Sequence, residues 1–185
     1  MSGNINPPVT DRRVERTRSA LRSAFNRLVL TKGYAAFSAA DVAGQANVGR
    51  STFYEHYRGK EDILAQSLLP ILAPLADTCV ADRTDPALLA AVEHFWTNRR
   101  HTRALLTGRA RDVVVRQLAL LIGERLARTA PMRSLLPAPI AAAHLANGQI
   151  AIIDAWVTGQ HGSTATAIAD ALHRISRAVT HALDG

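Results

Sequence analysis

The stretch that decides the fold runs from residue 16 to residue 64 and reads RTRSALRSAFNRLVLTKGYAAFSAADVAGQANVGRSTFYEHYRGKEDIL. Its first part places Leu21, Phe25 and Val29 on one face at the period of an amphipathic helix. Gly33 is expected to end this helix, because glycine readily takes the left-handed conformation common after a helix C-terminus. The pattern therefore predicts one long helix followed by a run of shorter elements.

The second part of the stretch predicts two short helices around a sharp turn. Ser38 is suited to cap the first of them, and Asp41, three residues later, completes a capping box. Asn47 tolerates the left-handed conformation that a tight turn requires. A second short helix begins at about Arg50, and Lys60 opens a further helix behind it. This order of parts is a helix-turn-helix, in which the second short helix enters the major groove of DNA.

The first residues of that second helix are the candidates for reading bases. They are Arg50, Ser51 and Thr52. Arg50 is the best candidate, because its planar guanidinium can donate to both acceptors of a guanine. Thr52 offers a methyl group to thymine or a hydroxyl to phosphate. Tyr54 and His56 are expected on the outer side within reach of phosphates; the alternative is that they are ordinary surface residues.

Lys60 is a candidate for holding phosphate. It stands at the start of a helix, where its charge adds to the free backbone amides of the first turn. Phe53 and Tyr57 are expected to face the core of the small domain instead.

The positive charge of the chain is concentrated in the same region. Residues 1–60 hold ten lysines and arginines against four acids, a net charge of +6, whereas residues 61–185 hold twelve against eleven, a net charge of +1. A basic segment on a near-neutral body is typical of a nucleic-acid reader. A solvated basic face or a membrane-surface patch would have the same charge, and the motif favours DNA.

The quoted stretch resembles a known family over some fifty residues. From Ser38 to Leu64 it reads S-x-x-D-V-A-x-x-A-x-V-x-R-x-T-F-Y-x-H-Y-x-x-K-E-x-I-L, which is similar to the N-terminal domain of the tetracycline-repressor (TetR) family of transcriptional regulators. The family usually has Gly where this chain has Asn47, and Ser or Thr where it has Gly49; both substitutes suit the backbone. The resemblance implies that seven residues meet DNA: Ser38, Arg50, Ser51, Thr52, Tyr54, His56 and Lys60.

Beyond the helix-turn-helix the pattern is helical throughout, which predicts an all-α chain of about nine helices. Asp85-Pro86 is expected to start one of them, and Gly108 to end a short one. The predicted organisation has three parts: a flexible N-terminal arm at 1–10, a three-helix helix-turn-helix domain at 11–59, and a helical effector-binding and dimerisation domain at 60–185.

The last two predicted helices, at 139–159 and 164–183, are suited to pairing two chains. Their many Ala and Gly residues would let helices approach closely, and the resemblance implies a four-helix interface in a homodimer; packing on the chain's own body is the alternative. A dimer would bind near-palindromic operator DNA with half-sites ~34–36 Å apart. The stripes that would pair are Leu145, Gln149, Ile152 and Trp156 on the first helix, and Ile168, Leu172, Ile175, Val179 and Leu183 on the second.

A small-molecule effector is implied by the resemblance, since family members enclose a pocket among their central helices and repression is the family default. Four polar-capable residues on apolar helices are the candidate ligand contacts: His94, Trp96, Gln117 and Asn147. The alternative for each of them is an ordinary helix-packing role, which is the more common one for such residues. The apolar surroundings favour an apolar or amphipathic effector. The competing hypothesis is a constitutive or architectural DNA-binding protein that has no effector.

No enzyme motif is present in the sequence, which has no G-x-S-x-G, no H-E-x-x-H, no Walker loop and no Cys/His metal spacing. We therefore expect no catalytic residue, no cofactor and no metal. The single cysteine, Cys79, suits a reducing cytoplasm. The most apolar run, LLPILAPLA at 68–76, is far shorter than the about 20 residues of a membrane span. No signal peptide is apparent, so a cytoplasmic location away from membranes is expected.

Overall fold

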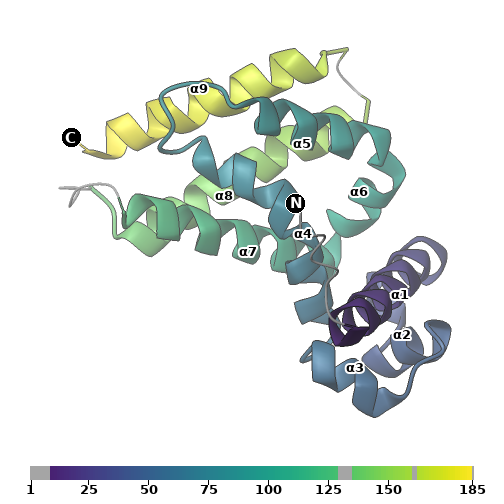
Figure 1. The fold of residues 1–185 in the computed structure, drawn as a ribbon. Coiled ribbons are helices and arrows are strands. Elements are labelled where there is room, and N and C mark those ends of the chain that lie inside the picture. The colour runs from purple at the N-terminus through teal and green to yellow at the C-terminus, as the bar shows by residue number, and fades with distance from the viewer. Residues whose placement is uncertain (1–8, 129–134, 160–161, 185) are drawn as a thin grey trace, which may run out of the picture. The chain divides into compact units, whose positions relative to one another are not determined.

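The computed structural model describes residues 9–128, 135–159 and 162–184 (Figure 1). Within these ranges the backbone forms nine α-helices and one short 3-10 turn, and it contains no strand. The all-α prediction is therefore confirmed. The predicted N-terminal arm lies outside the described residues except at its last two positions. Two compact units divide the chain between Ile63 and Leu64, and the two are taken separately below.

The first unit contains the predicted helix-turn-helix. Phe25 and Phe53, from two different helices, are almost completely buried in it. The rings of Phe25, Tyr34 and Phe37 meet edge-on in all three pairs, with centroids 5.6 to 6.2 Å apart. Gly33, with φ 79°, follows the first helix as predicted. The elements are α1 (Val9–Lys32), η1 (Tyr34–Ala36), α2 (Ala39–Gln45), α3 (Arg50–His56) and the first turn of α4 (Lys60–Asp77).

The turn between α2 and α3 is built on Asn47, whose φ of 54° is in the left-handed region. Its amide donates to the Gly44 carbonyl at 3.1 Å, and the Val48 amide donates to the Ala43 carbonyl at 3.0 Å. This pair of bonds is a Schellman motif, which satisfies the last carbonyls of α2. Asn47 therefore does the work that glycine does in the family pattern, and it sets the direction in which α3 leaves.

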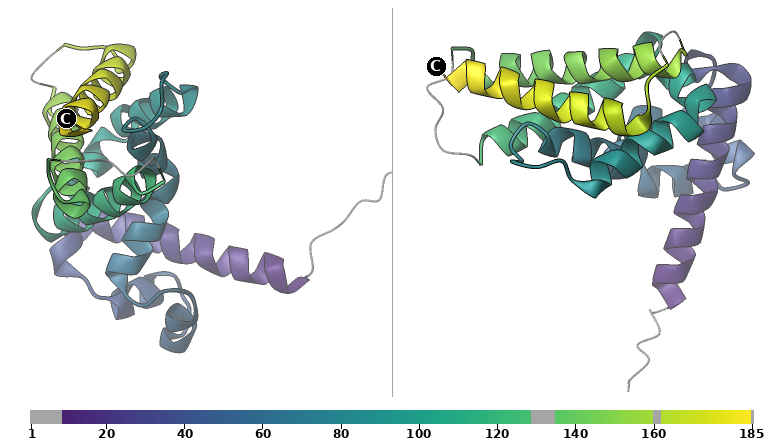
Figure 2. Two further views of the ribbon diagram at one scale, coloured as in Figure 1. Left: turned by 90° about the vertical axis from the view of Figure 1, so that its left-hand side faces the viewer. Right: turned by 90° about the horizontal axis from the view of Figure 1, so that it is seen from above.

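The second unit is a bundle in which α8 is central. This helix packs against α7, α9, α5 and α6. Figure 2 (right) shows α8 and α9 lying side by side with no other helix in front of them. Besides the rest of α4, the elements are α5 (Pro86–Thr97), α6 (Arg99–Leu105), α7 (Gly108–Leu126), α8 (Ala138–Val157) and α9 (Ala165–Asp184).

Helix boundaries in this unit follow the predicted caps with one exception. Asp85 caps α5 as expected, and its carboxylate accepts from the Ala87 amide at 2.7 Å. Gly108, which was expected to end a short helix, is instead the first residue of α7 and has φ 50°. Both assignments place a left-handed glycine between two helices, and the hydrogen-bond pattern decides to which helix it belongs.

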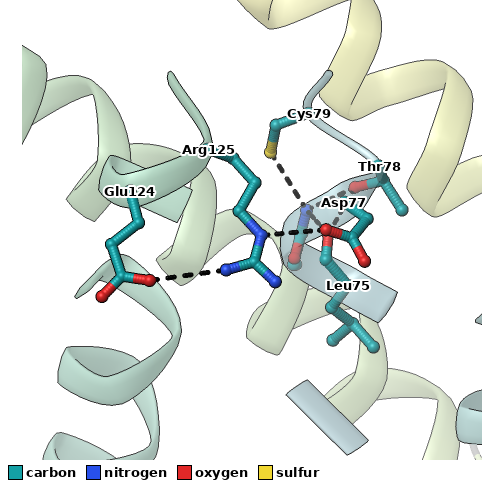
Figure 3. Close-up of polar contacts among 7 residues, drawn as sticks. Leu75, Asp77, Thr78, Cys79, Glu124 and Arg125 are labelled. Carbon is teal, nitrogen blue, oxygen red and sulfur yellow. Dashed lines mark hydrogen bonds and ion pairs between the residues drawn. The ribbon is translucent and has the colours of Figure 1, made fainter. Parts of the chain in front are cut away.

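A buried polar cluster joins the end of α4 to α8 and α9. Figure 3 shows its residues Leu75 and Thr78 beside the ion pair of Asp77 and Arg125. The Gln149 amide nitrogen lies 2.8 Å from the Ser176 hydroxyl, 2.9 Å from the Thr78 hydroxyl and 3.2 Å from the Leu75 carbonyl, and these three acceptors share its two N–H groups. Nearby, the Arg125 guanidinium pairs with Asp77 at 2.9 Å. The bonds of Gln149 give α8 a polar anchor in a mainly apolar interior.

Several residues predicted to pair two chains are instead buried inside this unit. Gln149, Leu145 and Trp156 are each no more than 4% exposed, and Leu172 of the second stripe is completely buried. These residues therefore pack on the chain's own body, which was the alternative interpretation. Ile175 is different, because half of its side chain is exposed.

Among the described helices, α8 alone is long and apolar enough, by length and composition, to cross a membrane. Half of its most apolar window is buried inside the protein, and Ile150 and Ile153 are completely covered. Since a core helix of a bundle passes the same test, the packing of α8 accounts for its hydropathy.

Candidate nucleic-acid interface

The N-terminus of α3 faces solvent, because the opposite face of the helix is anchored in the core. Phe53 is fully buried, and it anchors the inner face of the helix. Arg50 and Ser51 are exposed, and Thr52 is half-buried. Gly49 caps the helix without a side-chain hydrogen bond. The first turn of α3 therefore offers the three predicted base-reading side chains together on one uncovered helix end.

Arg50 and Tyr54 lie one turn apart on the outer face of α3. The guanidinium carbon of Arg50 is 5.9 Å from the centroid of the Tyr54 ring, within reach of a cation–π interaction. The same ring meets Phe53 nearly at right angles, with centroids 5.4 Å apart. Tyr54 as a whole remains 49% exposed.

Ser38 has a structural role that the sequence predicts. Its hydroxyl donates to the Asp41 carboxylate at 2.6 Å and accepts from the Asp41 amide at 3.3 Å, and its own amide donates to the same carboxylate at 2.7 Å. The predicted capping box is thus confirmed. The Ser38 hydroxyl and amide lower the pKa of Asp41, since both donate to its charged form. A contact between Ser38 and DNA stays a prediction.

Lys60 is turned toward the protein. Its ammonium donates to the Tyr34 carbonyl at 2.8 Å and to the Phe37 carbonyl at 2.7 Å. The nitrogen also lies 4.6 Å from the centroid of the Tyr34 ring and 5.2 Å from that of Phe37. These acceptors are backbone carbonyls more than twenty residues away, and no sequence pattern points to them. The predicted phosphate contact of Lys60 is untested.

The C-terminal end of α3 is tied to α1. His56 is half-buried, whereas Tyr57 is 2% exposed, as expected for a core residue. Burial raises the pKa of Tyr57, and the nearby Arg22 opposes this shift. Arg22 also pairs with Glu15 at 2.7 Å, and this hydrogen bond raises the pKa of Arg22. The reading helix is therefore held at both ends, by the Asn47 turn and by α1.

The four candidate ligand residues are not brought to one place. His94 and Trp96 are exposed on α5, where Trp96 stacks on Trp156 with ring centroids 4.9 Å apart. Gln117 is half-buried on α7. Asn147 alone lines a described groove, which has a volume of about 820 Å³ and lies along α7 and α8.

The groove between α7 and α8 is mainly apolar. The two helices approach closely, since a Cβ added at Gly123 would lie 3.9 Å from that of Ala142. Leu120 is 59% exposed at its edge, and Arg111 and Arg116 line it as well. This surface suits an apolar or amphipathic molecule better than a polar one. Of this lining, sequence reasoning found only Asn147. Half of the lining residues are alanine, valine or leucine, and Asp112 and Glu124 lie beside the two arginines.

Comparison with known proteins agrees with this geometry. Residues 22–66 match the family described as bacterial regulatory proteins, tetR family, and this segment includes all of α2 and α3. Residues 22–66 are a TetR-family DNA-binding domain. The chain is 40% identical over 68 residues to the uncharacterized HTH-type transcriptional regulator YxbF of Bacillus subtilis (strain 168). That match covers 36% of this chain and 18% of the relative's length.

Solved structures share the fold of this chain beyond its DNA-binding domain. A TetR transcriptional regulator from Streptococcus agalactiae 2603V is 24% identical, with a TM-score of 0.58 over 91% of this chain and 98% of that one. NalD, the secondary repressor of the MexAB-OprM multidrug efflux pump in Pseudomonas aeruginosa, is 20% identical, with a TM-score of 0.51 over 89% and 95% of the two chains. At these identities the likeness shows the fold alone.

Proposed function

We propose that this TetR-family regulator is a cytoplasmic repressor that binds near-palindromic operator DNA as a homodimer. A small apolar or amphipathic effector lowers its affinity for the operator. The observation that carries the proposal is the uncovered N-terminus of α3, where Arg50, Ser51 and Thr52 stand above the buried anchor Phe53. A helix end of this kind is what a major groove accepts.

The side chains on α3 divide into two kinds of contact. Arg50 reads a base edge, because a guanidinium can donate two parallel hydrogen bonds to a guanine. Tyr54 and His56 hold phosphates, and Thr52 contacts a thymine methyl group or a phosphate. Phosphate contacts set the register of the head, and the base contact supplies the sequence preference.

The homodimer forms through the outer faces of α8 and α9. On α8 the exposed side includes the small residues Gly148, Ala151 and Ala155, beside the larger Ile140 and His144. On α9 it includes Ile175 and Ala178. Small side chains let helices of two protomers approach closely, and a two-fold axis would present two heads to the two half-sites. This face lies opposite the buried stripe of Gln149.

The effector binds in the body, residues 64–185. Support comes from the apolar groove along α7 and α8, to which Asn147 contributes the polar atoms of an amide. Because α4 belongs to both units, a change in its position is the available route from the body to the head. Linkage then requires operator DNA to weaken effector binding by the same factor as the effector weakens DNA binding.

Selection of duplexes from a random pool tests the DNA-binding proposal. The wild-type protein should enrich a near-palindrome whose half-sites lie one helical turn apart, and it should bind this selected duplex at least about a thousandfold more tightly than a scrambled one at physiological salt. Enrichment of no sequence would mean that the protein binds DNA without sequence preference.

A thermal-shift screen of apolar and amphipathic compounds tests the effector proposal. Compounds that raise the melting temperature should also release the selected duplex. If every stabilising compound leaves DNA affinity unchanged, the competing hypothesis of a constitutive DNA-binding protein is correct.

A further inference from the structure

The Lys60 ammonium lies in a cage made by the connection between α1 and α2. The cage consists of the carbonyls of Tyr34 and Phe37, at 2.8 and 2.7 Å from the nitrogen, and of the rings of the same two residues. Phe25 supports both rings edge-on from α1. Phe25, Tyr34 and Phe37 are each at most 5% exposed, so these walls are packed inside the first unit.

The two carbonyls belong to the segment that leads into α2, so the cage connects α4 to α2. Tyr34 begins the 3-10 turn η1, and Phe37 immediately precedes Ser38, the N-cap of α2. Lys60 is the first residue of α4. The ammonium therefore ties the first turn of α4 to the start of α2, and α2 carries α3. All of these contacts lie within the first compact unit.

Charge and hydrogen bonding hold the ammonium inside the cage. A lysine nitrogen that donates to two carbonyls and faces two rings would have to give up these interactions to reach a phosphate. A cation that keeps its internal partners when DNA binds displaces no counterion from the duplex, and so it adds nothing to the salt dependence of binding.

We infer that Lys60 is a positioning residue for DNA reading and not a phosphate anchor. The cage fixes α2, and with it the angle at which α3 offers Arg50 to the bases. This inference rests on the proposed function and deepens it. Any movement of α4 would act on α2 and α3 through the contacts of Lys60 in its first turn.

Two substitutions at this position separate positioning from phosphate binding. Lys60→Met keeps the length of the side chain and removes its charge and donors. Lys60→Arg keeps the charge, but its planar guanidinium does not fit a cage spaced for an ammonium. Lys32→Met is the matched control, since Lys32 is an exposed lysine of the same head.

Affinities are measured on the duplex selected by the wild type and on a scrambled duplex, at several salt concentrations. All titrations are made well below each variant's melting temperature, where circular dichroism shows wild-type helix content. In both Lys60 variants the ratio of the affinity for the selected duplex to that for the scrambled duplex should fall roughly tenfold. This is the loss expected for one misplaced base contact. Lys60→Met should keep the wild-type salt slope, and Lys32→Met should keep the preference.

Three results would overturn the inference. A salt slope about one unit shallower in Lys60→Met, with wild-type behaviour in Lys60→Arg, would make Lys60 a phosphate anchor. If both variants fold and keep the wild-type preference for the selected duplex, the cage only stabilises the fold. A wild-type protein without any preference would overturn the proposed function and this inference with it. If Lys60→Met does not fold, Lys60→Arg decides the question alone.

Discussion

Arg50 and Tyr54 occupy neighbouring turns of the same helix face, yet we expect them to meet different parts of DNA. Arg50→Ala should cost ~1–3 kcal/mol of binding free energy on the selected duplex and much less on a scrambled one, because only the correct base offers two acceptors to the guanidinium. Equilibrium titrations on both duplexes measure this difference.

Tyr54→Phe is the matched comparison at the same scale. It keeps the ring that faces Arg50 and removes only the hydroxyl, so binding to both duplexes should weaken similarly and the salt dependence should stay unchanged. Equal losses on both duplexes for Arg50→Ala would instead show that Arg50 holds phosphate.

At the scale of the element, the capping box makes the stability of α2 depend on pH. The pKa of Asp41 is lowered in the folded protein, so its carboxylate stabilises the fold above the unfolded pKa of about 3.9. That contribution is lost as the pH falls through the lowered folded pKa. The free energy of unfolding of Asp41→Asn should therefore lie below that of the wild type near pH 6 and approach it in acid, as measured by urea unfolding.

Ser38→Ala provides the second arm of this experiment. It removes the N-cap hydroxyl and should lower the stability by about 1 kcal/mol. Because Ser38 and Asp41 bond to each other, the double variant should lose less than the sum of the single losses. Strict additivity, or an Asp41→Asn loss that is the same at pH 3 and pH 6, would contradict a functioning capping box.

At the scale of the whole molecule, the exposed faces of α8 and α9 are expected to hold two protomers together. Ile175→Glu places a charge in the middle of that face and should dissociate the homodimer at micromolar concentration, as measured by light scattering. Operator binding should weaken in parallel, because a monomer meets only one half-site.

Ala90→Glu is the control for this experiment, since Ala90 is exposed on α5, a helix that is not part of the proposed face. It should remain dimeric and bind DNA as the wild type does. A wild-type protein that is monomeric, or an Ile175→Glu protein that stays dimeric, would show that this face does not pair.

The helix-turn-helix could be predicted from the sequence because the interactions that define it are local. Ser38 and Asp41 are three residues apart, and Asn47 closes the turn with amides and carbonyls of its own segment. Asp85 likewise caps α5 through an amide two residues away. In each case residue type and spacing are sufficient, since a capping side chain or a left-handed turn needs no distant partner.

Tertiary structure alone decided which side of α8 faces the body and where Lys60 points. The sequence of α8 has small and apolar residues on every side of the helix. It therefore does not distinguish the side that carries Gln149, which is buried, from the side that carries Ala151, which is exposed. Lys60 bonds to backbone carbonyls, which every residue possesses and which therefore leave no mark in a sequence. The sequence by itself determined the reading helix and its caps. Packing between distant segments decided which face of α8 is buried and which groups Lys60 contacts.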